Sequence, residues 1–369
     1  MIYTRGSRDD YDSWAKSTHD PGWSWNSLFS YAKKHEKWTL PVGGRNITGQ
    51  FDPQFHGFNG KTLVSLRQSP PDAFEARVLQ TTKDLKEFPY NIDPNSGRAL
   101  GVTWTQSTIG NGERCSSATA YLDTPARKRP NLDIVLNTQA TRVLRSSTGK
   151  HLDIRTVELG PRSGGTTRKT FTATKELVLS AGSINTPQIL LLSGIGPRKE
   201  LGALGIPIVH DLPDVGRRLS DHSNDGAVAG ASIILLTPKS RGSVTLKSNN
   251  PFDSSKALIL ATSATLSTSK LLEKGLASYD VSSLDRHEEA GFDDQVRTWI
   301  LSTWHPVGIA AMSARGSKSG VLEPDLRVKG VKGLRVVDAS AFPVIPTGHT
   351  QAGVYMLAER AADLIKNSW

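Results

Sequence analysis

Two histidines stand out because each lies beside a residue that interrupts regular structure. His305 comes directly before Pro306, and a residue in that position is biased away from the helical region toward an extended or turn conformation. His349 lies in the segment PTGHTQ, just before a helical pattern begins. Histidine changes its charge near neutral pH, and a side chain at the end of an element can reach a pocket. Both residues are therefore candidates for general acid–base chemistry.

The residue types alone leave three interpretations of this pair open. Each imidazole can be a hydrogen-bonded structural residue, since a lone histidine carries little specificity. Two imidazoles that meet in one small volume can bind a metal ion, but no third ligand follows at a recognisable spacing, so we predict no metal site. The same two imidazoles can also share a proton and do acid–base work near neutral pH.

The elements around the histidines follow from hydrophobic spacing. Residues 334–337 predict a strand that ends at Asp338, and residues 352–366 predict a helix, because their apolar side chains fall on one face. Residues 294–301 predict a further helix, which the proline after His305 breaks.

A strand, a sharp turn and a helix are predicted farther up the chain. Residues 177–179 predict a buried strand, and the small residues after it predict the turn. The helix is expected to be capped by Asn185 or Thr186, to begin at Pro187 and to end at Gly194. Such a unit places backbone N–H groups and the positive end of a helix beside an anion.

The first half of the chain predicts smaller elements. Residues 25–37 have helical spacing, and residues 69–86 predict a helix with prolines in its first turn. A short strand is expected at 133–136. Residues 139–180 alternate in the manner of strands, with a hairpin at 160–167.

Composition excludes several classes of protein. The 369 residues are 37% hydrophobic and 22% charged, which is typical of a globular chain with a buried core. One cysteine, Cys115, excludes a disulfide framework and a cysteine-based zinc site, and we expect it to be buried or half-buried. The net charge is +10, but the basic residues are scattered, so we expect no nucleic-acid partner. No apolar run approaches the roughly 18 residues of a membrane span, so we expect no membrane partner either.

Blocks of the sequence, taken in order, resemble the glucose-methanol-choline (GMC) family of flavin-dependent oxidoreductases. They cover nearly the whole chain except residues 254–296. Within the family, the HPVG and HTQ motifs resemble the fungal aryl-alcohol oxidase-like branch. The blocks are MIYTRG, WSWNSLFSYAKKHE, FHGFNGKTLVSL, TQSTIGNGERCSSATAYLDTPARKRPNL, ELVLSAGSINTPQILLLSGIG, DVGRRLSDH, LLTPKSRGSVTL, WHPVGIAAM and LRVVDASAFPVIPTGHTQAGVYMLAERAADLIK.

The resemblance implies that FAD is the cofactor and that a small-molecule alcohol, aromatic and primary in the resembling branch, is the substrate. In the proteins it resembles, oxidised FAD accepts hydride from the carbinol carbon while a histidine takes the hydroxyl proton, and the matching base here is His305. His349 matches the second position, which orients the alcohol and stabilises the developing alkoxide. The resemblance leaves open whether oxygen or a quinone is the electron acceptor.

The resemblance also implies cofactor-binding residues. Asp338 and Ala339 match the strand end that approaches the ribityl chain and pyrophosphate of the flavin. Thr350 and Gln351 match the segment whose backbone faces the isoalloxazine ring at a helix N-terminus. Ala140 matches the position that contacts adenine through its backbone, where the family usually has valine.

The chain departs from the family pattern in two ways. It contains no strand followed by G-x-G-x-x-G and a helix, and the resemblance jumps over most of the substrate domain after His222. We therefore expect a partial α/β GMC fold, in which residues 1–225 and 297–369 form an interleaved, incomplete Rossmann-like FAD-binding domain. Residues 226–296 would be the remnant of a sheet-backed substrate-binding domain. As written, the chain is expected to bind FAD poorly. The alternative is a truncated, catalytically inactive family member that acts as a binding or scaffold protein.

Overall fold

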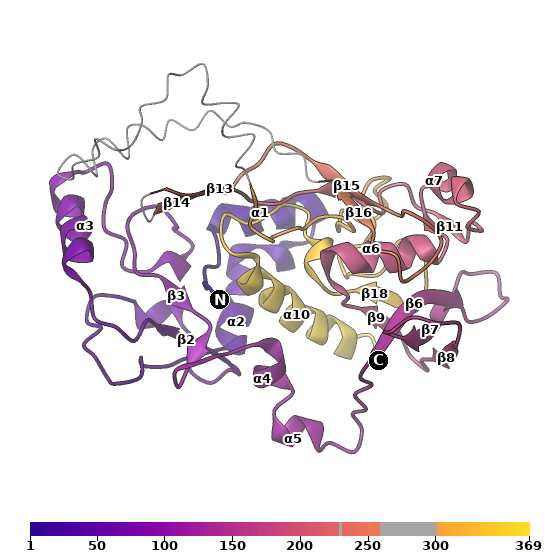
Figure 1. Ribbon diagram of the computed structural model, residues 1–369, viewed down its shortest axis with the longest axis horizontal. Coiled ribbons are helices and arrows are strands. Elements are labelled where there is room, and N and C mark those ends of the chain that lie inside the picture. The colour runs from indigo at the N-terminus through magenta and orange to yellow at the C-terminus, as the bar shows by residue number, and fades with distance from the viewer. Residues whose placement is uncertain (229–230, 259–300) are drawn as a thin grey trace.

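Helices and strands both contribute to the fold, as the sequence predicts. The computed structural model describes residues 1–228, 231–258 and 301–369 (Figure 1). The C-terminal helix α10 (Thr350–Lys366) lies near the centre of the view, with other helices and several small sheets around it (Figure 1). In these described ranges, no helix is both long and apolar enough to cross a membrane.

The N-terminal helices pack against the C-terminal one. α1 (Arg8–Thr18) packs beside α2 (Trp25–His35), and α2 packs along α10. The helices predicted at 25–37 and 352–366 are therefore confirmed. α2 ends at His35 because the next residue, Glu36, already has an extended backbone and begins a strand.

The helix predicted at 69–86 is confirmed with a different start. α3 (Ala73–Asp84) begins after Asp72, and the two prolines lie before it rather than in its first turn. Asp72 and Glu75 form a capping box, in which each side chain accepts the backbone N–H of the other residue. This reciprocal cap decides where the helix begins.

A small sheet places the first residues of the chain. β1 (Glu36–Trp38) pairs in parallel with β2 (Thr62–Leu66), which pairs antiparallel with β3 (Gln106–Ser107). The N-terminal segment runs along β3, because Tyr3 donates its N–H to the Gln106 carbonyl at 2.8 Å. The start of the chain is thus held against β3, and Tyr3 is fully buried.

The alternating stretch forms an antiparallel sheet. β6 (Thr138–Arg145) pairs with β7 (Ile154–Pro161), and β7 pairs with β8 (Lys169–Thr172), so the hairpin predicted at 160–167 is confirmed. The strand predicted at 133–136 is wrong, because these residues pair with no strand among the described residues. Val135 and Leu136 are 65% and 75% exposed, so apolar side chains there mark no buried strand.

The strand–turn–helix unit is present, but its helix begins earlier than predicted. β9 (Leu177–Leu179) pairs in parallel with β18 (Leu334–Val336), which confirms both predicted strands. α6 (Gly182–Leu192) contains Pro187 inside it, so neither Asn185 nor Thr186 is its cap. The cap comes from across the chain: the Asp338 carboxylate accepts the Gly182 N–H at 3.0 Å.

The middle of the chain forms two further sheets. β12 (Arg217–Leu219), β15 (Gly242–Thr245) and β16 (Lys256–Leu258) form one, and β14 (Ala231–Leu235), β13 (Ser223–Val228) and β17 (Leu301–Ser302) form the other. The predicted helix at 294–301 lies outside the described residues except for Leu301, which is in β17. Much of the predicted substrate-domain remnant, 226–296, also lies outside them, so the domain division stays a prediction.

Short elements complete the described fold. Cys115 is 5% exposed, which confirms the expectation of a buried thiol. Trp14 of α1 contacts Phe342 with ring centroids 4.5 Å apart and donates its indole N–H to the Val344 carbonyl at 2.9 Å, so the main core reaches the segment before His349. The remaining elements are η1 (Pro21–Trp23), η2 (Pro53–Phe55), η3 (Pro94–Ser96), β4 (Ile109–Gly110), β5 (Glu113–Arg114), α4 (Ser117–Tyr121), α5 (Thr124–Arg127), β10 (Ile195–Gly196), α7 (Arg198–Ala203), β11 (His210–Asp211) and η4 (Ala339–Ala341).

Candidate active site

The fold brings the two candidate histidines into contact. The rings of His305 and His349 lie edge to face, with centroids 5.0 Å apart. A third histidine, His222, contacts His305 at a centroid distance of 5.2 Å, and its Nδ1 is 2.9 Å from Nδ1 of His305. The three described residues form a row of imidazoles, which we call the histidine cluster.

His305 is held by the turn that follows β17. Its backbone N–H donates to the Asp221 carboxylate at 2.9 Å, and the other oxygen of that carboxylate accepts the Ser302 hydroxyl. Thr303 lies 3.1 Å from His305 Nδ1 through its hydroxyl oxygen. Trp304 has a φ of +61° and is 87% exposed, so a bulky residue occupies the left-handed region at this turn. That conformation costs free energy, which the anchors on either side of Trp304 must offset.

His349 is held by the N-terminal segment. Its backbone N–H donates to the Thr4 hydroxyl oxygen at 2.9 Å, and the same oxygen lies 3.2 Å from His349 Nδ1. Gly348 allows this approach, because a Cβ there would lie 2.7 Å from the backbone nitrogen of Gly6. Residue 349 also precedes α10 as its N-cap and makes no side-chain cap bond, so the ring is engaged by Thr4 and not by its own helix.

Burial keeps the histidine cluster uncharged at neutral pH. It lowers the pKa of His305 below the usual value. For His222 and His349, burial first and then the charge of protonated His305 lower the pKa to about 4. A neutral imidazole has a lone pair with which it can accept a proton, so the cluster is poised for base chemistry rather than for charge–charge binding.

The low pKa of His222 predicts an acid-sensitive fold. Its pKa is about 4 in the folded state against an ordinary 6.5, so between these pH values the unfolded chain binds a proton that the folded chain does not. Stability is therefore lost as the pH falls through this window. We expect His222→Asn to flatten the dependence of the unfolding free energy on pH by at most about 1.4 kcal/mol per pH unit. Urea unfolding at several pH values measures this dependence of the unfolding free energy on pH.

His151→Asn is the matched control, because His151 is exposed in the turn between β6 and β7. It should leave the pH dependence as it is in the unmodified chain. An equal slope for the unmodified chain and His222→Asn would show that His222 protonates as readily in the folded state as in the unfolded state.

His305 and His349 of the histidine cluster line a pocket of about 500 Å³. The first turn of α10 forms one wall, which brings the positive end of a helix to the pocket. Two of the predicted cofactor-binding residues, Thr350 and Gln351, line it together with both candidate histidines. The other lining residues are Met1, Ile2, Thr108, Arg114, Cys115, Ser116, Ser117, Trp304, Val354 and Tyr355.

Ala140 lines a second cavity, of about 590 Å³, beside the first turn of α6. Ala181 and Ile184 of that turn also line it, and the hydroxyl of Ser183 between them is buried with no hydrogen-bond partner in the described part of the chain. An unsatisfied hydroxyl at a helix N-terminus suits a phosphate or sugar hydroxyl. The first turn of α6 borders this cavity and the first turn of α10 borders the other, so each cavity offers a bound anion the positive end of a helix.

Asp338 connects β18 to the first turn of α6. One carboxylate oxygen accepts from Gly182 N at 3.0 Å and the Thr186 hydroxyl at 2.6 Å. The other accepts the backbone N–H and the hydroxyl of Ser340 at 2.8 and 2.5 Å. These bonds occupy the acceptor positions of a carboxylate. The geometry favours Asp338 as a residue that orders the turn, while Ala339 begins η4 directly after it.

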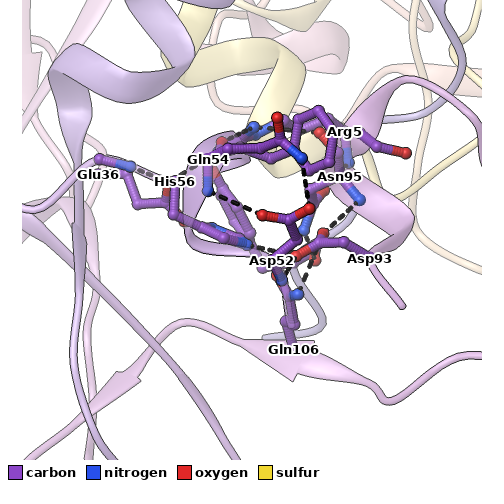
Figure 2. A network of polar contacts seen from close by, with 12 residues as sticks. Arg5, Glu36, Asp52, Gln54, His56, Asp93, Asn95 and Gln106 are labelled. Atoms are coloured by element: carbon purple, nitrogen blue, oxygen red, sulfur yellow. Dashed lines mark hydrogen bonds and ion pairs between the residues drawn. The ribbon is translucent and has the colours of Figure 1, made fainter. Parts of the chain in front are cut away.

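A buried charged network includes Arg5, the residue after Thr4 in the chain (Figure 2). Arg5 forms an ion pair with Glu36 at 2.7 Å, the other Glu36 oxygen lies 2.8 Å from His56 Nδ1, and His56 Nε2 lies 2.7 Å from Asp93. The side chains of all four residues are fully buried. Asn95 connects this buried network to the first residues of the chain, because its side-chain oxygen accepts the backbone N–H of Arg5 at 2.7 Å.

The buried network is ionised. Burial raises the pKa of Glu36, but the Arg5 charge and the His56 bond outweigh it and leave the pKa below the usual value. Burial lowers the pKa of His56, but its bonds to Asp93 and Glu36 outweigh burial and raise it. Burial likewise raises the pKa of Asp93, and the His56 bond reverses the effect. Arg5 and His56 are the positive groups and Glu36 and Asp93 the negative ones, so each charge lies beside one of opposite sign.

Three residues of the site escaped the sequence analysis: His222, Thr4 and Thr303. The first ends the DVGRRLSDH block, and the second lies in MIYTRG, so both were inside motifs that resemble the family. Nothing in their spacing relates them to His305 or His349, since Thr4 and His349 are 345 positions apart in the chain. Among the described residues, no group of three His, Cys, Asp or Glu side chains has the geometry of a metal site.

The chain is similar to several known proteins. Pyranose dehydrogenase 3 from Leucoagaricus meleagris is 32% identical over 480 residues, covering 100% of this chain and 78% of that protein, so the relative has internal segments without a counterpart here. A solved fungal aryl-alcohol oxidase has a TM-score of 0.84 at 22% identity, covering 100% of this chain and 84% of that one. An FAD-dependent oxidoreductase from Chaetomium thermophilum has a TM-score of 0.81 at 24% identity, with 100% and 84% covered.

The family models decide the assignment. Two models described as GMC oxidoreductase match residues 1–224 and residues 238–358, the first for the N-terminal part of the family and the second for the C-terminal part. The predicted resemblance is thereby confirmed, and with it the mixed α/β fold and FAD as the cofactor of the family. The chain belongs to the GMC oxidoreductase family.

Proposed function

We propose that the protein oxidises an alcohol group of a small molecule with FAD as its cofactor, and that His305 accepts the hydroxyl proton. The observation that carries the proposal is the pairing of His305 and His349, with ring centroids 5.0 Å apart, in the wall of one pocket. Burial lowers the pKa of both rings, which keeps them neutral and able to take up or share a proton at neutral pH.

The two histidines have different tasks in this proposal. His305 accepts the proton of the substrate hydroxyl, because a carbinol carbon releases hydride readily only as its oxygen gains negative charge. His349 orients the alcohol and donates a hydrogen bond to the developing alkoxide. FAD, when bound, supplies the hydride acceptor. The anchors of the two rings, Asp221 and Thr4, fix their positions so that the alcohol needs little further ordering.

The cofactor contacts are assigned on the same basis. Thr350 and Gln351 would face the flavin ring from the N-terminus of α10, whose positive end favours negative charge on a reduced ring. Ala140 would border adenine in the second cavity. Asp338 and Ala339 would lie near the ribityl chain and pyrophosphate, with the carboxylate of Asp338 acting through the order it imposes on α6.

The substrate class is tested by a panel of alcohols. We propose a primary alcohol, aromatic in the manner of the oxidase whose fold is similar, and the identity to a pyranose dehydrogenase makes a sugar hydroxyl the second candidate. Benzyl alcohol derivatives and aldopyranoses should be assayed with oxygen and with a quinone as acceptor, in the presence of excess FAD. Turnover of neither class with either acceptor would contradict the proposed function.

FAD itself is expected to bind weakly to these 369 residues. The G-x-G-x-x-G turn that cradles the pyrophosphate in dinucleotide folds does not occur in them, so the ring and adenine contacts must act without it. Titration of the chain into FAD, followed by flavin fluorescence, should show little quenching at micromolar protein. A yellow purified protein that carries stoichiometric FAD would overturn this expectation.

The alternative function is that of an inactive family member that only binds a ligand or partner. The missing glycine-rich turn favours it, whereas the intact pairing of His305 and His349 opposes it. The alcohol panel separates the two, because an inactive member would give no product even at FAD concentrations that saturate the protein.

A further inference from the structure

The hydroxyl of Thr303 has one hydrogen, and its position sets the role of the oxygen. Thr303 donates this hydrogen to the His222 carbonyl at 2.9 Å. The same oxygen lies 3.1 Å from Nδ1 of His305. Because the hydroxyl hydrogen is donated to the carbonyl, the Thr303 oxygen can only accept a hydrogen bond from the ring. His305 therefore carries a hydrogen on Nδ1.

The hydroxyl of Thr4 works in the opposite sense. Its oxygen already accepts the backbone N–H of His349 at 2.9 Å, and it lies 3.2 Å from Nδ1 of the same residue. Within the described part of the chain, Nδ1 is the acceptor that the hydroxyl hydrogen can reach. This arrangement favours the tautomer of His349 that has a lone pair at Nδ1 and its hydrogen on Nε2.

We infer that Thr303 and Thr4 are positioning residues that hold His305 and His349 in opposite tautomers, the first as a base at Nε2 and the second as a donor at Nε2. The inference rests on the proposed function and deepens it. A base needs a free lone pair toward the substrate hydroxyl, and a group that stabilises an alkoxide needs a hydrogen there. Two threonines thus make chemically different groups out of two identical side chains.

His222 completes the arrangement. Because His305 Nδ1 carries the hydrogen, Nδ1 of His222 at 2.9 Å must accept, and His222 then has its own hydrogen on Nε2. Backbone hydrogen bonds of His222 to Pro346 and Leu236 partly oppose the lowering of its pKa by burial. When His305 gains a proton at Nε2, its Nδ1–H still points at two acceptors, which stabilises the cation that forms.

Nitrogen NMR of the chain labelled with ¹⁵N-histidine tests the inference without flavin or substrate. In a neutral imidazole, the nitrogen that carries hydrogen and the one that does not resonate far apart, so each tautomer is read directly. We expect the Nδ1–H tautomer for His305 and the Nε2–H tautomer for His349 and His222 at neutral pH. The same tautomer for His305 and His349 would overturn the inference.

Substitution shows whether the threonines are the cause. Thr303→Val and Thr4→Val should each broaden or shift the signals of the contacted histidine, and Thr303→Ser and Thr4→Ser should restore them, since serine keeps the hydroxyl. Thr18→Val is the control: it removes the same hydroxyl from a residue that is more deeply buried than Thr303 and Thr4, and the Thr18 hydroxyl donates to the Trp14 carbonyl of its own helix. Unchanged tautomers in both valine variants would overturn the role of the threonines.

Turnover gives a second, independent reading. With excess FAD, we expect Thr303→Val to lower kcat about 10-fold or more with a smaller change in KM, because the tautomer matters in the transition state rather than in binding. The corresponding serine variant should recover most of the rate. Opposite tautomers in a chain that oxidises no alcohol would leave the inference standing and refute the proposed function, whereas identical tautomers in an active enzyme would do the reverse.

Discussion

Replacing Glu36 with glutamine is expected to lower the free energy of unfolding by about 3–5 kcal/mol. Glu36 is the negative charge between Arg5 and His56, and all three side chains are fully buried. The substitution leaves both cations without their shared partner in a medium that solvates charge poorly. Equilibrium unfolding in urea, followed by tryptophan fluorescence, measures the loss.

A surface ion pair supplies the control for this prediction. Arg198 and Asp211 lie 3.1 Å apart, but their side chains are 67% and 41% exposed. Asp211→Asn removes the same kind of charge and should cost less than about 1 kcal/mol, because water screens the pair. Equal losses for Glu36→Gln and Asp211→Asn would mean that the buried charges are not ionised in the folded protein. If Glu36→Gln also shifts the NMR signals of His349, the buried network helps to hold Thr4 against His349.

Replacing His305 with alanine is expected to reduce alcohol turnover by about 10²–10⁴-fold. The loss follows from removing the only base proposed for the hydroxyl proton, while the pocket and the cofactor contacts at Thr350, Gln351 and Ala140 remain. Turnover should be measured with excess FAD, and flavin quenching by the variant should match that of the unmodified chain.

His151→Ala is the control, since this exposed histidine lies in the turn between β6 and β7. It should leave both turnover and quenching unchanged. His349→Ala should lower turnover less than His305→Ala, because it removes a hydrogen bond to the alkoxide and not the proton acceptor. A turnover of His305→Ala equal to that of the unmodified chain would refute the assignment of the base.

Local pattern was enough to predict the elements that carry the candidate residues. The strand before Asp338 and the helix after His349 have clear hydrophobic spacing, and Pro306 and Gly348 mark the turns that expose the two histidines. These signals depend only on residues that are neighbours in the sequence, so the elements they predict are also found in the folded structure. The family resemblance implies that the two rings lie close together. In the structure their centroids are 5.0 Å apart.

Features that depend on distant parts of the chain were missed. α6 begins at Gly182 and not near Pro187, because its cap, Asp338, lies 156 positions away. The residues at 133–136 look like a strand, yet no described strand pairs with them. The spacing of neighbouring residues carries no information about strand partners or helix caps that come from remote segments. These contacts are known only from the folded structure.

The same limit applies to the site. The network from Arg5 to Asp93 joins the chain start to Glu36 of β1 and to His56, which lies 20 positions farther along the chain. His222 reaches His305 over 83 positions, and Thr4 reaches His349 over 345. Single residues of common types carry no signal of such contacts, so local pattern predicts candidates for the chemistry but not the groups that set their protonation.

The most direct test of the central claim is the anaerobic reduction of FAD by an alcohol in the presence of the chain. With FAD and protein in excess over their dissociation constant, a primary aromatic alcohol or an aldopyranose should bleach the visible flavin absorbance, and the aldehyde or keto product should appear in equal amount. His305→Ala should bleach it about 10²–10⁴-fold more slowly. Bleaching at the same rate with and without His305, or no bleaching by any alcohol at full flavin occupancy, would contradict the account.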